Sequence, residues 1–258
     1  MKLSACIEIL YPQLPFEERI AAAAKDGLSA IEFWSFAGKN LPLIGKTCKE
    51  NNIPIAACCV STENKALSER FSQTGLIDYY SPGIFAEMCK ESLEVAVKYD
   101  IPSLIVCSGN DNPAQDAEHK DYYLTQSLIY AAEIFKDTPV TLVVEPLNLF
   151  DHPGTYLTRS DHTYNILQNV GSDKVKMLYD IYHQQMTEGN LAANIQKLMP
   201  HIGHFHSADV PGRHELQTGE INWEYIFSVI EKAGYDRYIG LEYLTTTDTT
   251  KGLPKRFF

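Results

Sequence analysis

The chain has 258 residues, of which 45% are hydrophobic and 21% are charged, a composition typical of a folded globular protein rather than a disordered or fibrous one. Its formal net charge of −11 opposes nucleic-acid binding, which needs clustered lysine and arginine. Its apolar runs are far shorter than the roughly 20 residues that span a bilayer. We therefore expect neither a nucleic-acid nor a membrane partner.

The N-terminal segment and the cysteines both indicate a cytoplasmic protein. Glu8, Pro12 and Pro15 interrupt the apolar segment that a secretory signal would need. The six cysteines form no Cys-x-x-Cys pair, and several lie within apolar runs, where cysteine behaves as a small hydrophobic residue. We expect them to be reduced core residues, because a chain of this size does not need a disulfide framework.

Short apolar runs alternate with longer amphipathic segments along the whole chain. The runs predict strands at residues 3–10, 29–34, 53–60, 103–108, 141–147, 175–182, 202–208 and 238–244. The amphipathic segments predict helices at residues 15–26, 41–51, 82–99, 117–136, 160–169, 190–199 and 222–233. Alternation of β and α implies a parallel sheet, and eight units over this length favour a single (β/α)8 TIM barrel of class α/β.

We expect one barrel domain over residues 1–258, since no linker-like or repeated segment interrupts the pattern. Residues 61–81 form a long polar connection after the third predicted strand, without a predicted element of their own. Loops that follow barrel strands belong to the active-site face, so this connection is a candidate lid.

Charged residues end the last four predicted strands, at the end of a barrel where active sites are built. They are Glu145, Asp180, His206 and Glu242. Burying an unpaired carboxylate costs several kcal/mol, and three converging carboxylates would repel one another. One divalent ion would resolve that repulsion. The oxygen-rich set with one imidazole suits Mn²⁺, Mg²⁺ or Co²⁺ better than a thiolate zinc site would, and Zn²⁺ stays open. The alternative is that each group meets a surface loop separately.

Five ordered segments carry a family resemblance: Val-Glu-Pro-Leu-Asn at 144–148, Tyr-Asp-Ile-Tyr-His at 179–183, Gly-His-Phe-His-Ser-Ala-Asp at 203–209, Thr-Gly-Glu-Ile-Asn-Trp at 218–223 and Gly-Leu-Glu-Tyr at 240–243. Together they resemble the hydroxypyruvate isomerase family of the xylose isomerase-like barrel superfamily. The resemblance extends over nearly the whole chain from Ile31. It implies one divalent metal on the four strand-end residues and a proton-transfer pair formed by Glu145 and Glu242. It also implies that His183 and Arg213 contact the substrate.

The resemblance implies an aldose–ketose type isomerisation of a small hydroxy-carbonyl compound through a cis-enediolate, with hydroxypyruvate converted to tartronate semialdehyde. The metal would stabilise the negative charge that develops on the substrate oxygens. A substrate with a carboxylate needs a cationic anchor, and Arg70 and Arg213 are the two candidates. Arg213 lies on the loop that leaves a predicted catalytic strand, whereas Arg70 lies in the connection 61–81.

Three other functions stay open at this point. A ketose 3-epimerase would use the same metal and glutamate pair, and His206 favours it because hydroxypyruvate isomerases often have glutamine there. A DNA repair endonuclease would need more histidines on the third and fourth strands, which here end in Cys58-Cys59 and Cys107-Ser108. A non-catalytic sugar-binding barrel would not need to retain both glutamates. Acidic barrels of this kind often pair, so a homo-oligomer is a further expectation.

Overall fold

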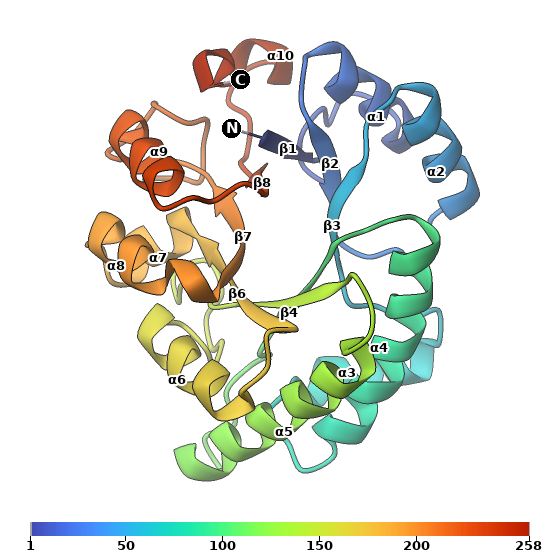
Figure 1. Ribbon diagram of the computed structural model, residues 1–258, viewed down its shortest axis with the longest axis vertical. Coiled ribbons are helices and arrows are strands. Elements are labelled where there is room, and N and C mark those ends of the chain that lie inside the picture. The colour runs from blue at the N-terminus through green and yellow to red at the C-terminus, as the bar shows by residue number, and fades with distance from the viewer. Residues whose placement is uncertain (1, 258) are drawn as a thin grey trace.

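The computed structural model describes residues 2–257, and its centre is a closed barrel of eight parallel strands in sequential order (Figure 1). The strands are β1 (Lys2–Cys6), β2 (Ala30–Phe33), β3 (Ile55–Cys59), β4 (Ser103–Cys107), β5 (Thr141–Glu145), β6 (Val175–Asp180), β7 (Ile202–Ser207) and β8 (Tyr238–Leu241). The strand β8 pairs with β1 and closes the barrel. The predicted (β/α)8 fold is confirmed.

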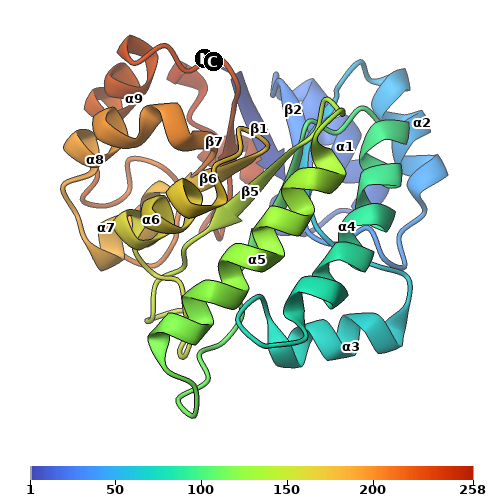
Figure 2. The same cartoon turned by 60° about the horizontal axis from the view of Figure 1, so that its bottom comes forward.

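Helices surround the strands, as the views in Figures 1 and 2 show. They are α1 (Phe16–Lys25), α2 (Leu41–Glu50), α3 (Lys65–Thr74), α4 (Ser81–Lys98), α5 (Ala117–Phe135), α6 (Ser160–Val170), α7 (Ile181–Thr187), α8 (Leu191–Leu198), α9 (Trp223–Lys232) and α10 (Thr249–Gly252), with short 3-10 turns η1 (Met199–His201) and η2 (Lys255–Phe257). None of the helices within residues 2–257 combines the length and apolar character needed to cross a bilayer.

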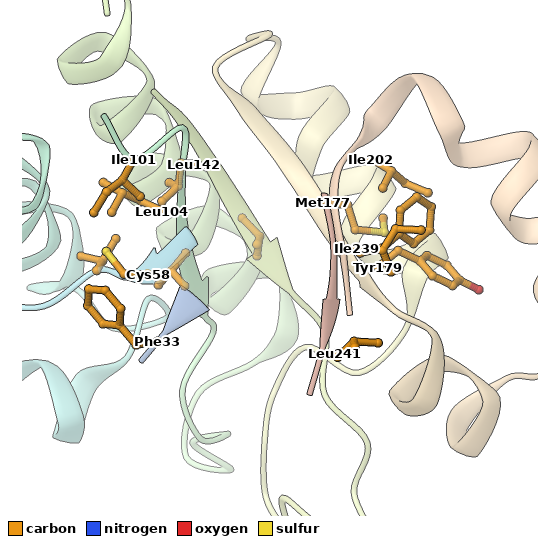
Figure 3. Close-up of a cluster of buried hydrophobic side chains, with 14 of the residues drawn as sticks. Phe33, Cys58, Ile101, Leu104, Leu142, Met177, Tyr179, Ile202, Ile239 and Leu241 are labelled. Carbon is orange, nitrogen blue, oxygen red and sulfur yellow. The ribbon is translucent and has the colours of Figure 1, made fainter. Parts of the chain in front are cut away.

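Alternation along the strands separates two apolar layers. The outer layer packs strand side chains against the helices, and Figure 3 shows part of it, including Phe33, Leu142, Met177 and Tyr179. The inner layer fills the barrel with a small cluster of Ala57, Ile105, Val143 and Leu178. Side chains two positions apart in a strand point to the same side of the sheet. Glu145 follows Val143 by two residues and Asp180 follows Leu178 by two, so both carboxylates point into the barrel, nearer its carboxyl end than the cluster.

The predicted helices agree with the observed ones to within one residue at each end, but the pattern missed three helices. The connection 61–81 contains α3, which buries only Leu67 and therefore has little apolar periodicity. Helix α7 falls partly within the predicted sixth strand because Ile181 and Tyr182 extend the apolar run of β6. Helix α10 has only four residues. The polar connection is thus partly helical, which corrects the expectation of a segment without regular structure.

The segment that follows α3 is held against the carboxyl end of β4 by a close backbone contact. Gly75 has φ +53°, and the backbone N–H of Leu76 donates to the carbonyl of Ser108 at 2.8 Å. A Cβ on Gly75 would lie 2.3 Å from the same carbonyl oxygen and 2.8 Å from Cα of Gly109. Only glycine can therefore occupy this position without displacing backbone atoms.

We predict that Gly75→Ala lowers the free energy of unfolding by roughly 2 kcal/mol or more, through a positive φ and a backbone clash together. Gly234→Ala is the matched control, because Gly234 has φ +81° and a Cβ added there would meet no atom within 4 Å. This control should show the φ cost alone, about 1 kcal/mol. Urea denaturation of both variants measures the difference. An equal loss of unfolding free energy in the two variants would contradict a backbone clash between position 75 and Ser108.

Candidate active site

Four buried polar side chains meet at the carboxyl end of the barrel. Glu145, Asp180 and His206 are carried by β5, β6 and β7, and Glu242 directly follows β8. Each offers one ligand atom, and these four atoms all lie within 4.8 Å of one another. The strand register produces this arrangement, because Asp180 pairs directly with His206, and His206 with Gly240. The structure thus brings together all four residues that the sequence singled out.

Some of the buried polar atoms at this centre lack a hydrogen-bond partner. Glu145 Oε1 and both ring nitrogens of His206 have no hydrogen-bond partner among the described residues. Nδ1 of His206 lies 3.4 Å from Glu145 Oε1 and 3.1 Å from Glu242 Oε2. Buried polar atoms are normally satisfied, so a buried carboxylate oxygen and a ring nitrogen that face each other without a hydrogen bond are consistent with a cation between them. Three carboxylates and one imidazole fit an oxygen-preferring divalent ion.

Asp180 divides its two oxygens between the scaffold and the centre. Oδ1 accepts from the backbone N–H groups of Tyr182 and His183 and so caps α7. Oδ2 faces the centre, 3.5 Å from both Arg213 Nη2 and His183 Nε2. The cap fixes the rotamer of the carboxylate and leaves one oxygen free for a ligand.

The charges at the centre are strongly coupled. Burial, with repulsion from Glu242, raises the pKa of Asp180 above its usual range despite the nearby Arg213. Glu242 behaves oppositely: burial opposes its ionisation, but His206 and Arg213 hold the pKa of this carboxyl well below its usual range. Burial likewise opposes a charge on His206, yet Glu242 and Glu32 raise the pKa of its imidazole well above normal. The carboxylates of Asp180 and Glu242 thus share the positive charges of His206 and Arg213.

Arg213 reaches the centre from the loop after β7. Its backbone has φ +56°, and its Nη2 pairs with Glu242 Oε2 at 2.5 Å. Burial opposes the charge on the guanidinium, but the carboxylates of Glu242 and Asp180 raise its pKa further. Asp209 braces the loop: its carboxylate accepts from three backbone N–H groups, those of Val210, Gln217 and Ile221, and from the indole of Trp223.

His183 also lies at the centre, on the first turn of α7. The side chain is fully buried, and its Nδ1 lies 2.7 Å from the side-chain nitrogen of Asn148. Burial, with a contribution from Arg213, lowers the pKa of His183 to about 4, although Glu145 opposes this shift. The imidazole is therefore neutral at physiological pH.

Arg70 lies elsewhere. It is on an exposed face of α3 and makes no ion pair or side-chain hydrogen bond with the four central residues in the part of the chain that the structure describes. The structure therefore brings Arg213, but not Arg70, into contact with Asp180 and Glu242. A role for Arg70 at the substrate stays a prediction from the sequence.

The sequence did not predict several residues that contact Glu145 or Glu242. The indole N–H of Trp34 donates to Glu242 Oε1 at 2.7 Å, and the Cys6 thiol approaches the same oxygen at 3.6 Å. The Cys107 thiol approaches Glu145 Oε2 at 3.6 Å. Trp34 and Cys107 lie at the ends of their strands, and that position was the signal that could have placed them here.

A second buried charge network lies one layer below the centre. Glu32 Oε2 is 2.8 Å from His204 Nε2 and 3.5 Å from His206 Nε2, and its other oxygen accepts from Ser4. Gly240 makes room for this carboxylate, because a Cβ there would lie 1.9 Å from Glu32 Oε1. The network supports His206 from below, so Glu32 and His204 have a structural role beneath the centre.

Comparison with known proteins identifies the family. The profile described as "Xylose isomerase-like TIM barrel" matches residues 20–255. The chain belongs to the xylose isomerase-like TIM barrel family. Similar curated proteins include a 2-oxo-tetronate isomerase of Cupriavidus necator, 32% identical over 98% of this chain and 96% of the relative. A hydroxypyruvate isomerase of Escherichia coli is 30% identical over 98% of this chain and 97% of the relative.

Solved structures extend the comparison. A structure titled AP endonuclease, family 2, from Brucella melitensis has a TM-score of 0.91 at 27% identity and covers 98% of this chain and 97% of its own. A D-allulose 3-epimerase from Methylomonas sp. shares the fold with a TM-score of 0.76 at 15% identity. The match covers 95% of this chain and 85% of the epimerase chain. The resemblance to hydroxypyruvate isomerases and the expectation of an isomerase are confirmed by the curated relatives.

We predict that Glu32→Gln lowers the free energy of unfolding at pH 7 by roughly 3 kcal/mol. Burial disfavours the Glu32 charge, but His204 and His206 lower its pKa from 4.5 to about 2. A carboxyl with a depressed folded pKa stabilises the fold above its unfolded pKa, and that contribution is lost as the pH falls from 4.5 towards 2.

The stability gap between wild type and Glu32→Gln should therefore be largest above pH 5 and shrink towards pH 2, as measured by urea denaturation at several pH values. Glu133→Gln is the control, because Glu133 lies on the surface in an exposed pair with Lys136 and should change little. A gap that stays constant between pH 6 and pH 2 would contradict the assignment.

Proposed function

We propose that this protein isomerises a short 2-oxo acid with a neighbouring hydroxyl group, of the hydroxypyruvate or 2-oxo-tetronate type, with one bound divalent metal. The observation that carries the proposal is that one potential ligand atom from each of Glu145, Asp180, His206 and Glu242 lies within 4.8 Å of the others. Several buried polar atoms of this group have no hydrogen-bond partner within residues 2–257. The curated relatives support the substrate class, because both of their names denote short 2-oxo acids.

The metal would be held by the four central residues. When bound, a divalent ion supplies Lewis-acid stabilisation of the negative charge that develops on the carbonyl and hydroxyl oxygens of the substrate. Mn²⁺, Mg²⁺ and Co²⁺ suit the three carboxylates, and the single imidazole is also compatible with Zn²⁺. The chain's own groups must then move the proton.

Glu145 and Glu242 are the proposed proton-transfer pair. A base removes the proton from the carbon that bears the hydroxyl group, which gives a cis-enediolate, and an acid returns a proton to the former carbonyl carbon. The hydroxyl proton passes in the same reaction to the former carbonyl oxygen, so that the carbonyl and the hydroxyl exchange places. Glu242 accepts hydrogen bonds from Trp34 and Arg213, whereas Glu145 accepts one from the weak Cys107 thiol and has His206 Nδ1 at 3.4 Å from its other oxygen. This asymmetry favours Glu145 as the group that removes the first proton.

Arg213 is the proposed anchor for the substrate carboxylate. Its guanidinium is largely buried and lies at the ligand cluster, so a substrate of three or four carbons can reach both. A planar guanidinium matches a carboxylate with two parallel hydrogen bonds. The enediolate alone does not discriminate isomerisation from 3-epimerisation, and this anchor is the feature that favours an oxo acid over a ketose.

Glu145→Gln and Glu242→Gln should each lower kcat by about 10²- to 10⁴-fold, since each removes a general acid–base group while keeping its shape. The measurement is turnover of hydroxypyruvate and 2-oxo-tetronate with Mn²⁺, together with uptake of solvent deuterium at the product carbon. Mn²⁺ titration calorimetry keeps loss of the metal separate from loss of the base. Substantial turnover in either variant would reject the acid–base roles, and turnover of D-fructose-type ketoses instead of oxo acids would favour the 3-epimerase.

Arg213→Gln should raise KM for hydroxypyruvate by roughly 10- to 100-fold, because a charge-assisted bond to the substrate carboxylate is lost. Activity towards an uncharged analogue, dihydroxyacetone, should fall much less. Steady-state kinetics with both compounds measures this split. The same assay on Arg70→Gln tests the other predicted anchor, and a larger selective loss there would move the carboxylate site to α3.

A further inference from the structure

Asn148 lies on the loop after β5, three residues beyond Glu145, and is fully buried. Its side-chain Oδ1 accepts from the backbone N–H groups of Phe150 and Asp151, both at 2.9 Å. Only an oxygen can accept these two bonds, so the orientation of the amide is settled by its neighbours. The amide nitrogen must therefore point away from this turn.

The amide nitrogen has two hydrogens and two acceptors. Nδ2 of Asn148 lies 3.1 Å from Asp151 Oδ2 and 2.7 Å from His183 Nδ1. The backbone N–H of Asn148 also points at His183 Nδ1, at 3.4 Å. Two donors thus face one ring nitrogen, which can satisfy them only with its lone pair. In neutral imidazole, the proton then resides on the other nitrogen, Nε2.

Nε2 of His183 faces the centre of the site. It is buried and has no hydrogen-bond partner among residues 2–257, and it lies 3.5 Å from Asp180 Oδ2. A buried N–H without an acceptor is costly, so this group indicates an acceptor that arrives with the ligand. The geometry therefore offers a directed donor rather than a base at this side of the site.

We propose that Asn148 is a positioning residue that holds His183 in the tautomer with its proton on Nε2, so that the neutral imidazole donates a hydrogen bond to a substrate oxygen. The oxygen would belong to the carbonyl or the developing enediolate of the oxo acid, and that part rests on the proposed function. The tautomer itself does not, because it follows from hydrogen bonds within the chain.

The decisive variant reverses the donor without emptying the site. In Asn148→Asp combined with Asp151→Asn, one carboxylate oxygen still accepts from the turn, while the other now accepts from the side-chain amide at position 151 and from His183. The side-chain contact at 2.7 Å is shorter than the backbone contact at 3.4 Å, so we expect His183 to donate from Nδ1 and to present a lone pair at Nε2. Asp151→Asn alone is the matched control, since it leaves the amide of Asn148 facing His183. Asn40→Asp, at the N-cap of α2, controls for the added charge.

Long-range ¹H–¹⁵N NMR of protein labelled at histidine nitrogen, loaded with diamagnetic Mg²⁺, reads the tautomer directly. His183 is identified among the eight histidines by the signals missing in His183→Gln. Wild type and both controls should show a pyridine-like Nδ1 and a pyrrole-like Nε2. The double variant should show the reverse. A wild-type His183 with its proton on Nδ1, or a tautomer unchanged by the double variant, would overturn the proposal. Should the double variant not fold, the wild-type spectrum alone still decides.

Kinetics then test the consequence for catalysis. The double variant should lose roughly 10- to 100-fold in kcat/KM for the oxo acid, whereas Asn40→Asp should not. Adding the double variant to His183→Gln should cost nothing further, because the two changes remove one shared interaction. Additive losses would show that Asn148 does not act through His183. If wild type turns over no oxo acid, the proposed function fails while the tautomer assignment stands or falls by NMR.

Discussion

The structure depends on one electrostatic constraint: three carboxylates from different strands are buried at the same end of the barrel. Neither solvent nor a full set of donors balances them, and Arg213 offers a single permanent charge to Asp180 and Glu242. Such a cluster is unfavourable unless a cation joins it, because the Coulomb repulsion between close carboxylates is strong in a medium of low dielectric constant. This cost is distributed over three segments of the barrel, because Glu145 lies on β5, Asp180 on β6 and Glu242 directly after β8.

The surrounding residues share a simple geometry, in which one polar atom of each group is tied to the scaffold and the other faces the centre. Asp180 caps α7 with one oxygen and presents the other. Glu242 accepts from Trp34 on one oxygen and from Arg213 on the other. His183 accepts from Asn148 on one nitrogen and leaves the second free. Fixing one atom removes rotamer freedom before a ligand binds, so the ordering cost is already met by folding.

The sequence predicted the barrel and its four central residues because both depend on short-range patterns. Alternating β and α segments imply the fold, and a charge after a run of strand residues marks a strand end at the active-site face. Helix α3 was missed because it buries only Leu67, and α7 because its apolar start continues the run of β6. The contact of Cys6 with Glu242 and that of Asn148 with His183 join segments far apart in the chain, and neither residue carries a local signal for its partner.

The arrangement also bears on why barrels of this family support different reactions. An enediolate flanked by two carboxylates can be protonated at more than one carbon, so the glutamate pair alone does not determine the product. What determines it is which substrate carbon the binding groups place beside each carboxylate. In the function proposed for this chain, those groups are a directional donor on His183 and a cation on Arg213. The backbone of Arg213 has φ +56° and lies in the loop organised around Asp209. His183 and Arg213 lie on segments that follow β6 and β7. Substitutions in these segments do not alter the strands that position the four central residues. Specificity can therefore diverge while the charge cluster stays the same.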